Sequence, residues 1–282
     1  MTFKATDPIL LLEADQPSSS DIFRWSLFKL KGAATELGIR SYDLTRDRVA
    51  NRVHAPDIIQ YIEAPVIAYG SIQFIRALKV PHVAYGWTGT DWASTSANIP
   101  RQLLLNSDHV MTTWGDLSDN FHYWLERIDP LGLFVRPNSD KKIFAGIPIP
   151  RKDFEHVINA TNQTTSVQRD TICVLSSIKK IHAEYRFFIV DRKVVASSSY
   201  YSNWQPMSLQ SKPPEDAVRM AEIVSQLDWQ PDSAYTVDVA VLGDNSSRIV
   251  ELNSFCCSGF YHSDTTAILK AVVSQAIRDF NP

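Results

Sequence analysis

The sequence predicts an α+β protein in two parts, an α/β unit at residues 1–110 followed by an α+β unit at residues 111–282. In the first part, short apolar runs alternate with helical patterns, and parallel strands need helical crossovers between them. In the second part, β-branched and aromatic runs follow one another with turns between several of them, which is typical of antiparallel strands. The length of 282 residues allows a substantial buried core.

Strand and helix signals alternate regularly in the first part. A capping signal at Ser20-Asp21 opens a helix that ends near Gly38, and a short helix begins at Ile72. The apolar runs around these helices predict four strands, at residues 8–12, 39–44, 65–70 and 81–85.

The second part opens with a helical segment at residues 114–125 and continues mainly as strands. The expected strands are residues 133–137, 142–146, 172–175, 185–190, 193–197, 235–242 and 248–253. Helices are expected from Asp153, over residues 216–229 and over residues 264–280. The polar segment 159–170 is expected to be a surface loop.

Composition narrows the class of protein. A hydrophobic content of 44%, a charged content of 21% and a formal net charge of −3 are ordinary for a soluble globular protein and give no sign of a nucleic-acid or membrane surface. No apolar run is long enough to span a membrane. Three cysteines without a CxxC pair predict no disulfide framework and favour the cytoplasm. The oligomeric state stays open.

Several familiar phosphate-handling and catalytic motifs are missing from the sequence. No GxGxxG follows a strand, and the chain has no GxxxxGK[ST], HExxH, GxSxG or kinase-type HRD or DFG motif. A phosphate site in this chain would therefore need a different set of residues.

Two acidic side chains stand in consecutive apolar strands near the C-terminus. Asp238 lies in the strand 235–242, Glu251 lies in the strand 248–253, and the turn 243–247 joins them. Buried carboxylates need compensation, and Asn253 lies two residues after Glu251 on the same strand face. Two carboxylates and an amide oxygen suit Mg²⁺, a hard cation that prefers oxygen ligands. The alternative is hydrogen bonding at a sheet edge or turn.

Basic side chains occur at unusual strand positions as well. Arg136 ends a strand and Lys142 opens the next one, so the two cations can face an anionic ligand or simply occupy an exposed strand edge. Glu184 and Arg186 share one face of their strand. They can salt-bridge each other, or Arg186 can neutralise phosphate charge beside the metal.

The order of these residues resembles the ATP-grasp superfamily. An isolated acid, Asp238, followed by Glu251-x-Asn253 is part of that order. More narrowly, Phe134-Val-Arg136-Pro137, Lys142-x-Phe144-x-Gly146 and Glu184-Tyr-Arg186 are similar to a bacterial and phage clade named for two arginines and a lysine. The resemblance covers residues 131–275 and implies an ATP-grasp fold of two α+β subdomains. The unit before it is similar in layout to a pre-ATP-grasp α/β domain. The glycine-rich loop usual in the superfamily is not evident.

The resemblance implies a binding site for ATP and one or two Mg²⁺ ions. Its implied contacts come from ten residues in the second part. They are Arg136, Lys142 and Lys180 on the phosphates, Arg186 at the γ-phosphate, the backbone of Val174 and Leu175 on adenine at a hinge near residues 172–177, Glu184 by the ribose or hinge, and Asp238, Glu251 and Asn253 on Mg²⁺.

The resemblance also implies an activity, ATP-dependent joining of a carboxylate to an amine through an acylphosphate. The expected partners are small-molecule or peptide carboxylates and amines, not nucleic acid or membrane. Two alternatives stay open, an ATP-binding module without ligase activity and a phosphotransferase acting on a small substrate. The roles of Cys256, Cys257 and His262 also stay open between packing and an acceptor pocket.

Overall fold

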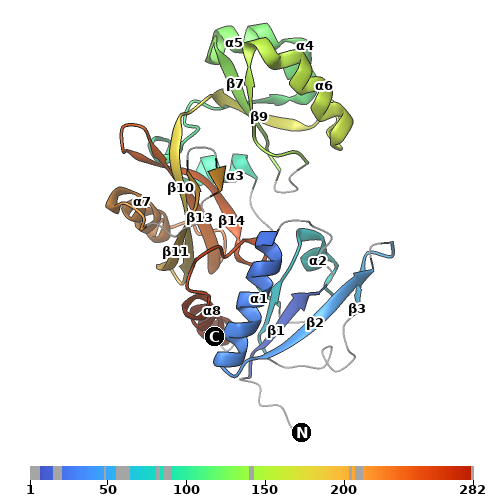
Figure 1. The fold of residues 1–282 in the computed structure, drawn as a ribbon, viewed down its shortest axis with the longest axis vertical. Helices are drawn as coiled ribbons and strands as arrows, with labels where there is room; N and C mark the ends of the chain where they lie inside the picture. The colour runs from blue at the N-terminus through green and yellow to red at the C-terminus, as the bar shows by residue number, and fades with distance from the viewer. Residues whose placement is uncertain are drawn as a thin grey trace.

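Among the described residues, three β-sheets organise the chain (Figure 1). The structure is a computed structural model, and it describes residues 7–14, 21–47, 49–54, 64–80, 83–85, 91–139, 143–202, 205–206 and 212–280. The first sheet is formed before residue 85, and the other two are formed after residue 109.

The first sheet has the order β3-β2-β1-β4-β5, and its pairs are parallel except for the antiparallel pair β2–β3. Its strands are β1 Ile9–Glu13, β2 Arg40–Asp47, β3 Arg52–His54, β4 Val66–Tyr69 and β5 Val83–Ala84, and its helices are α1 Asp21–Glu36 and α2 Ile72–Ala77. Successive side chains of β1 point to opposite faces, so Leu10 packs with α1 and Leu11 packs with α2. Helices therefore cover both faces, as a parallel sheet requires.

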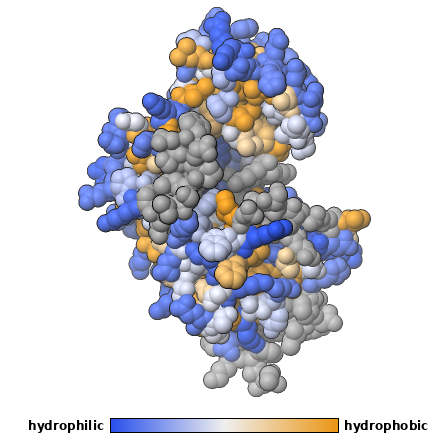
Figure 2. Space-filling model, in the orientation of Figure 1, coloured by the Kyte–Doolittle hydropathy of each residue, from blue (hydrophilic) through white to orange (hydrophobic). Residues whose placement is uncertain are grey.

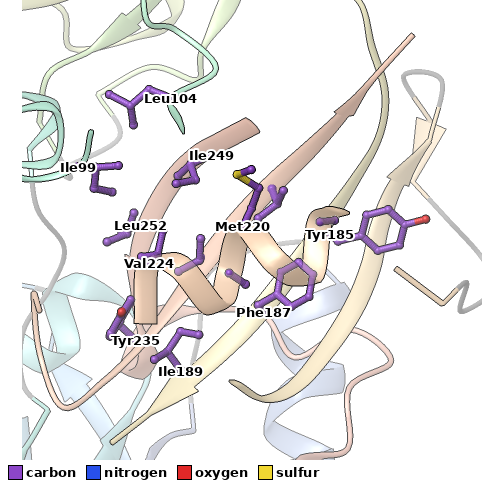
Figure 3. Close-up of a cluster of buried hydrophobic side chains, with 14 of the residues drawn as sticks. Ile99, Leu104, Tyr185, Phe187, Ile189, Met220, Val224, Tyr235, Ile249 and Leu252 are labelled. Atoms are coloured by element: carbon purple, nitrogen blue, oxygen red, sulfur yellow. The ribbon is translucent and has the colours of Figure 1, made fainter. Parts of the chain in front are cut away.

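The second sheet has the order β12-β11-β10-β13-β14 and is antiparallel throughout. Its strands are β10 Ile181–Val190, β11 Lys193–Ser202, β12 Gln205–Pro206, β13 Ala234–Leu242 and β14 Ser247–Ser254. Helix α7, Glu215–Gln226, packs Met220 and Val224 on one face, within the buried cluster drawn in Figure 3. Helix α8, Thr265–Phe280, lies against the other face and against α1.

The third sheet has the order β6-β9-β7-β8 and forms the upper lobe of Figure 1. Its strands are β6 Val110–Thr113, β7 Gly132–Pro137, β8 Ile147–Pro150 and β9 Ile172–Ser177. Helices α4 Trp114–Asp119, α5 Phe121–Ile128 and α6 Phe154–Thr164 pack with it. Helix α3, Trp92–Asn98, and the 3-10 helix Arg101–Leu103 lie on the connection from the first sheet. Further 3-10 turns are Arg151–Asp153 and Phe255–Cys257.

The structure corrects several sequence-based element predictions. Described residues 143–146 are not a strand, and β8 follows them instead. Residues 159–164 belong to α6 and not to a loop. The prediction was wrong because Thr161 is the one buried side chain among them, and the other polar side chains hide the amphipathic pattern. The helical segment 114–125 is two helices that meet at Asn120. The short strands β3 and β6 and helix α3 were not predicted.

The division into residues 1–110 and 111–282 stays a prediction.

None of the helices in the described part of the chain combines the length and the apolar character that crossing a bilayer requires.

Candidate active site

The β13–β14 pairing brings the three predicted metal ligands together. Asp238 lies opposite Glu251 in the register of the two strands. The Asn253 amide Nδ2 donates to Asp238 Oδ2 at 3.1 Å and to Glu251 Oε1 at 2.9 Å. The two carboxylates therefore lie on either side of one amide group.

Arg186 reaches the same place from β10. Its backbone is paired with that of Asp238, and its guanidinium binds the carboxylate at two points, Nε to Oδ1 at 2.8 Å and Nη2 to Oδ2 at 2.6 Å. Arg186 is 6% exposed and Asp238 is fully buried. A charge buried this deeply is tolerated only when paired and hydrogen-bonded, and the two-point geometry supplies both conditions.

Arg136 approaches from the third sheet. Its Nη2 lies 2.9 Å from Glu251 Oε2, and its guanidinium lies 5.2 Å from the centroid of the Trp92 ring. Arg136 therefore joins the two sheets at the carboxylate of Glu251 and is not an isolated charge on a strand edge.

Five side chains thus form one charge-balanced network, Arg136, Glu251, Asn253, Asp238 and Arg186. Their carboxylate and amide oxygens are of the kind that Mg²⁺ prefers, and the Asn253 amide can present its oxygen after a flip of its end group. The donor set therefore fits the cation. The described residues contain no group of three or more His, Cys, Asp or Glu side chains that could hold a metal ion.

A cleft of about 250 Å³ adjoins this network. It lies between the second and third sheets, since its lining comes from β7, β8, β10, β14 and the β9–β10 connection. The apolar lining residues are Leu105, Phe134, Pro148, Ile178, Ile181 and Val250, and the polar ones are Asn106, Arg136, Lys179 and Glu184. Figure 2 shows a hollow between the upper lobe and the rest of this face. An apolar cleft lined by the cations Arg136 and Lys179 suits a planar ring carrying an anionic tail.

The predicted hinge residues lie deeper in the fold than the cleft. Val174 and Leu175 belong to β9, the inner strand that pairs with both β6 and β7, so their backbone groups lie within two ladders. The part of this segment that lines the cleft is the β9–β10 connection, with Ile178 and Lys179.

The two neighbouring lysines have different environments. Lys180 is exposed, whereas Lys179 lines the cleft and binds Asp108 Oδ1 at 2.7 Å. Burial opposes ionisation of Asp108, but hydrogen bonds from Lys179 and Ser177 outweigh it and lower its pKa. Sequence reasoning missed Lys179, because the pattern Lys-Lys does not tell which of the two faces inward. Lys142 lies outside the described residues.

The cysteines and the histidine that follow Asn253 differ in exposure. Cys256 is buried, with its Sγ 3.5 Å from Cys257 Sγ, and contact with Cys257 together with burial raises its thiol pKa. A buried protonated thiol packs as a small apolar group. His262 is exposed, and its backbone N–H donates to Ser198 Oγ.

Comparisons with known proteins identify the family. The sequence matches the model of an ATP-grasp domain, family 3 of the clade named for two arginines and a lysine, over residues 36–274. No curated protein matches the chain. Its structure is similar to a D-cycloserine synthetase, DcsG, at 13% identity and TM-score 0.65, covering 97% of this chain and 100% of that one.

Two further solved structures show the same fold. The D-alanine–D-alanine ligase of Bacillus anthracis has 14% identity and TM-score 0.63, covering 97% of this chain and 98% of that one. The macrocyclase MdnC of Microcystis aeruginosa, bound to a precursor peptide, has 12% identity and TM-score 0.59, covering 95% and 99%. The α+β fold predicted from the sequence is confirmed as an ATP-grasp fold, and the chain belongs to family 3 of the ATP-grasp clade named for two arginines and a lysine.

Proposed function

We propose that the protein is an ATP-dependent ligase that joins a carboxylate to an amine through an acylphosphate. The observation that carries this proposal is the five-residue network, whose Arg136 also lines an apolar cleft. The solved ligases of similar fold act, by their descriptions, in forming D-cycloserine, a D-alanine pair and a peptide macrocycle. Small-molecule and peptide carboxylates and amines are accordingly the proposed substrates, and the cytoplasm is the proposed location.

In this proposal the cleft binds the nucleotide with its adenine against Phe134 and Ile181. The backbone of the β9–β10 connection, rather than Val174 and Leu175, supplies the adenine hydrogen bonds. Glu184 lies on the same lining and would accept hydrogen bonds from the ribose hydroxyls. Lys179, which lines the cleft, takes the phosphate role that the family resemblance implied for Lys180.

The phosphate tail would point toward Arg136 and Arg186. A guanidinium can bind a phosphate through two parallel N–H donors, as Arg186 binds the carboxylate of Asp238. Asp238, Glu251 and Asn253 would hold Mg²⁺, which neutralises phosphate charge when it is bound. Arg186 would donate to the γ-phosphoryl oxygens as negative charge spreads over them.

The proposed reaction has two steps. A carboxylate oxygen of the first substrate forms a bond to the γ-phosphorus as the bond to the ADP oxygen breaks, which gives an acylphosphate and ADP. The amine of the second substrate then bonds to the acyl carbon, and inorganic phosphate leaves while the amine loses a proton to solvent. The chain contributes positioning and charge stabilisation and needs no covalent protein nucleophile.

The test measures ADP release with pools of amino acids and short peptides, followed by mass spectrometry of the products. An amide-linked product together with ADP and phosphate supports the ligase. A phosphorylated substrate without an amide would indicate a phosphotransferase, and nucleotide binding without turnover would indicate a binding module. Glu251→Gln should abolish turnover, whereas Glu222→Gln on the exposed face of α7 should leave it unchanged.

A further inference from the structure

The face of the Arg186 guanidinium is covered by an aromatic ring. Its Cζ lies 5.4 Å from the centroid of the Tyr261 ring, and its Nη1 donates to the Gly259 carbonyl at 3.4 Å. The opposite edge of the guanidinium binds Asp238. One edge of the Arg186 guanidinium is therefore held by a carboxylate, and one of its faces is covered by an aromatic ring.

The backbone of Tyr261 is strained. Its φ of 43° lies in the left-handed region, which bulky residues adopt rarely and at a cost in free energy. Such a conformation persists only where the surrounding structure determines it.

Helix α1 holds this strained segment in place. Ser26 Oγ accepts from the Phe260 backbone N–H at 2.9 Å, and Lys29 Nζ donates to the Tyr261 carbonyl at 3.1 Å and to the Ser263 carbonyl at 2.5 Å. The Phe260 ring stacks on Phe188 of β10 with centroids 5.1 Å apart. A helix of the first sheet and a strand of the second sheet thus determine where Tyr261 lies.

The surroundings of the Tyr261 ring keep it neutral. Burial raises the pKa of the Tyr261 hydroxyl, although the nearby Arg186 opposes the shift. A neutral ring offers its negative face to a cation, and a desolvated contact of this kind is worth more than an exposed one.

We propose that Tyr261 is a positioning residue that holds Arg186 at its proposed place beside the γ-phosphate, and that Lys29 of α1 fixes Tyr261 for this role. This inference rests on the proposed function. Asp238 is itself a proposed metal ligand, so its carboxylate is shared between a cation and Arg186. The Tyr261 ring makes a contact with Arg186 that does not draw on that carboxylate, and it therefore keeps the guanidinium oriented while Asp238 serves the metal.

The first test compares Tyr261→Phe with Tyr261→Leu in steady-state ATP turnover. Phenylalanine keeps the ring and should keep most of kcat, whereas leucine should lower kcat by roughly ten- to hundredfold with little change in the KM for ATP. Tyr42→Leu, a half-buried tyrosine of β2, is the matched control and should leave kcat unchanged. Equal losses in the phenylalanine and leucine variants, or a leucine variant with full kcat, would overturn the proposal.

A second variant tests the link to α1. Lys29→Met keeps the Tyr261 ring but removes both hydrogen bonds to the segment, so kcat should fall in the same manner by a smaller factor. Thermal unfolding of each variant shows whether the fold is intact. Full kcat in a folded Lys29→Met protein would remove α1 from the proposal.

An NMR measurement separates this inference from the proposed function. The Arg186 Nε–H resonance is identified by its loss in Arg186→Lys, and a ring over the guanidinium shifts it through ring current. The resonance should stay in place in Tyr261→Phe and move or broaden in Tyr261→Leu. An unchanged resonance in Tyr261→Leu refutes the positioning role. If the wild-type protein turned over no ATP with any acceptor, only the proposed ligase function would be refuted.

Discussion

Arg186 and Asp238 lie opposite each other on β10 and β13 and form a buried two-point ion pair. The carboxylate oxygen Oδ2 that accepts from Arg186 Nη2 also accepts from the Asn253 amide. One oxygen is thus shared by a proposed phosphate-binding cation and a proposed metal ligand. Changes at either residue should alter stability and ligand binding together.

Replacing Asp238 with Asn leaves the Arg186 charge buried without its anionic partner. Breaking a buried pair in this way typically lowers the free energy of unfolding by about 3–5 kcal/mol. Urea unfolding should show this loss, and Mg²⁺-dependent turnover should disappear. The double variant Arg186→Met with Asp238→Leu should recover part of the stability but none of the turnover. A double variant as unstable as the single one would contradict the pairing.

Arg136 is expected to compete with a metal ion for Glu251. Arg136→Gln removes a guanidinium that lies 2.9 Å from Glu251 Oε2 and should tighten Mn²⁺ binding in the absence of nucleotide by a few-fold. The same change should weaken binding of a non-hydrolysable ATP analogue, because a phosphate contact is lost. Calorimetry measures both affinities, with Arg127→Gln on α5 as the control. Mn²⁺ affinity that falls in Arg136→Gln would argue against Glu251 as a ligand.

Gly146 keeps the cleft open beside Phe134. A Cβ at this position would lie 2.6 Å from Phe134 Cζ, so Gly146→Val should push that ring into the space proposed for adenine. The affinity for the ATP analogue should fall by roughly tenfold or more, the equivalent of about 1.4 kcal/mol. Fluorescence titration gives the affinity. Gly243→Val has open space around its Cβ and should bind the analogue normally. Unchanged affinity in Gly146→Val would place the adenine elsewhere.

We expect the stability of the protein to depend on pH through Asp232, a residue outside the candidate active site. Burial, with a smaller effect from Asp279 and opposed by the Ser233 backbone N–H, raises its pKa to about 6. The folded protein therefore binds this proton more tightly than the unfolded chain, whose aspartates titrate near pH ~4. The contribution of Asp232 to the free energy of unfolding is therefore complete below the pKa of the unfolded chain, and it is lost as the pH rises through the pKa of the folded protein.

Asp232→Asn should accordingly stabilise the protein at neutral pH by about 1–2 kcal/mol, a figure reduced for partial solvent screening. The gain should vanish in acid, where the wild-type carboxyl is already protonated. Urea unfolding across this pH range measures the difference. A gain that is constant with pH would point to another cause.

Local chemistry in the sequence was sufficient for much of the fold. The alternating strands and helices of the first part and the hairpins of the second part follow from the spacing of apolar side chains. This spacing repeats every two residues in a strand and every 3.6 residues in a helix, and it depends only on residues that are near one another in the chain. The polar helix α6 escaped this logic, because just two of its side chains are buried. The placing of Asp238 opposite Glu251 does not follow from the turn alone, because a β-bulge shifts the register of the hairpin between Val239 and Asp238.

Contacts between segments far apart in the chain come from the tertiary structure alone. The sequence shows that carboxylates and cations stand in apolar strands, where they need partners. It did not determine that Arg136 meets Glu251, that Lys179 rather than Lys180 lines the cleft, or that Tyr261 covers Arg186. These pairings depend on how three sheets and α1 pack on one another, and side-chain periodicity carries no information about distances between sheets.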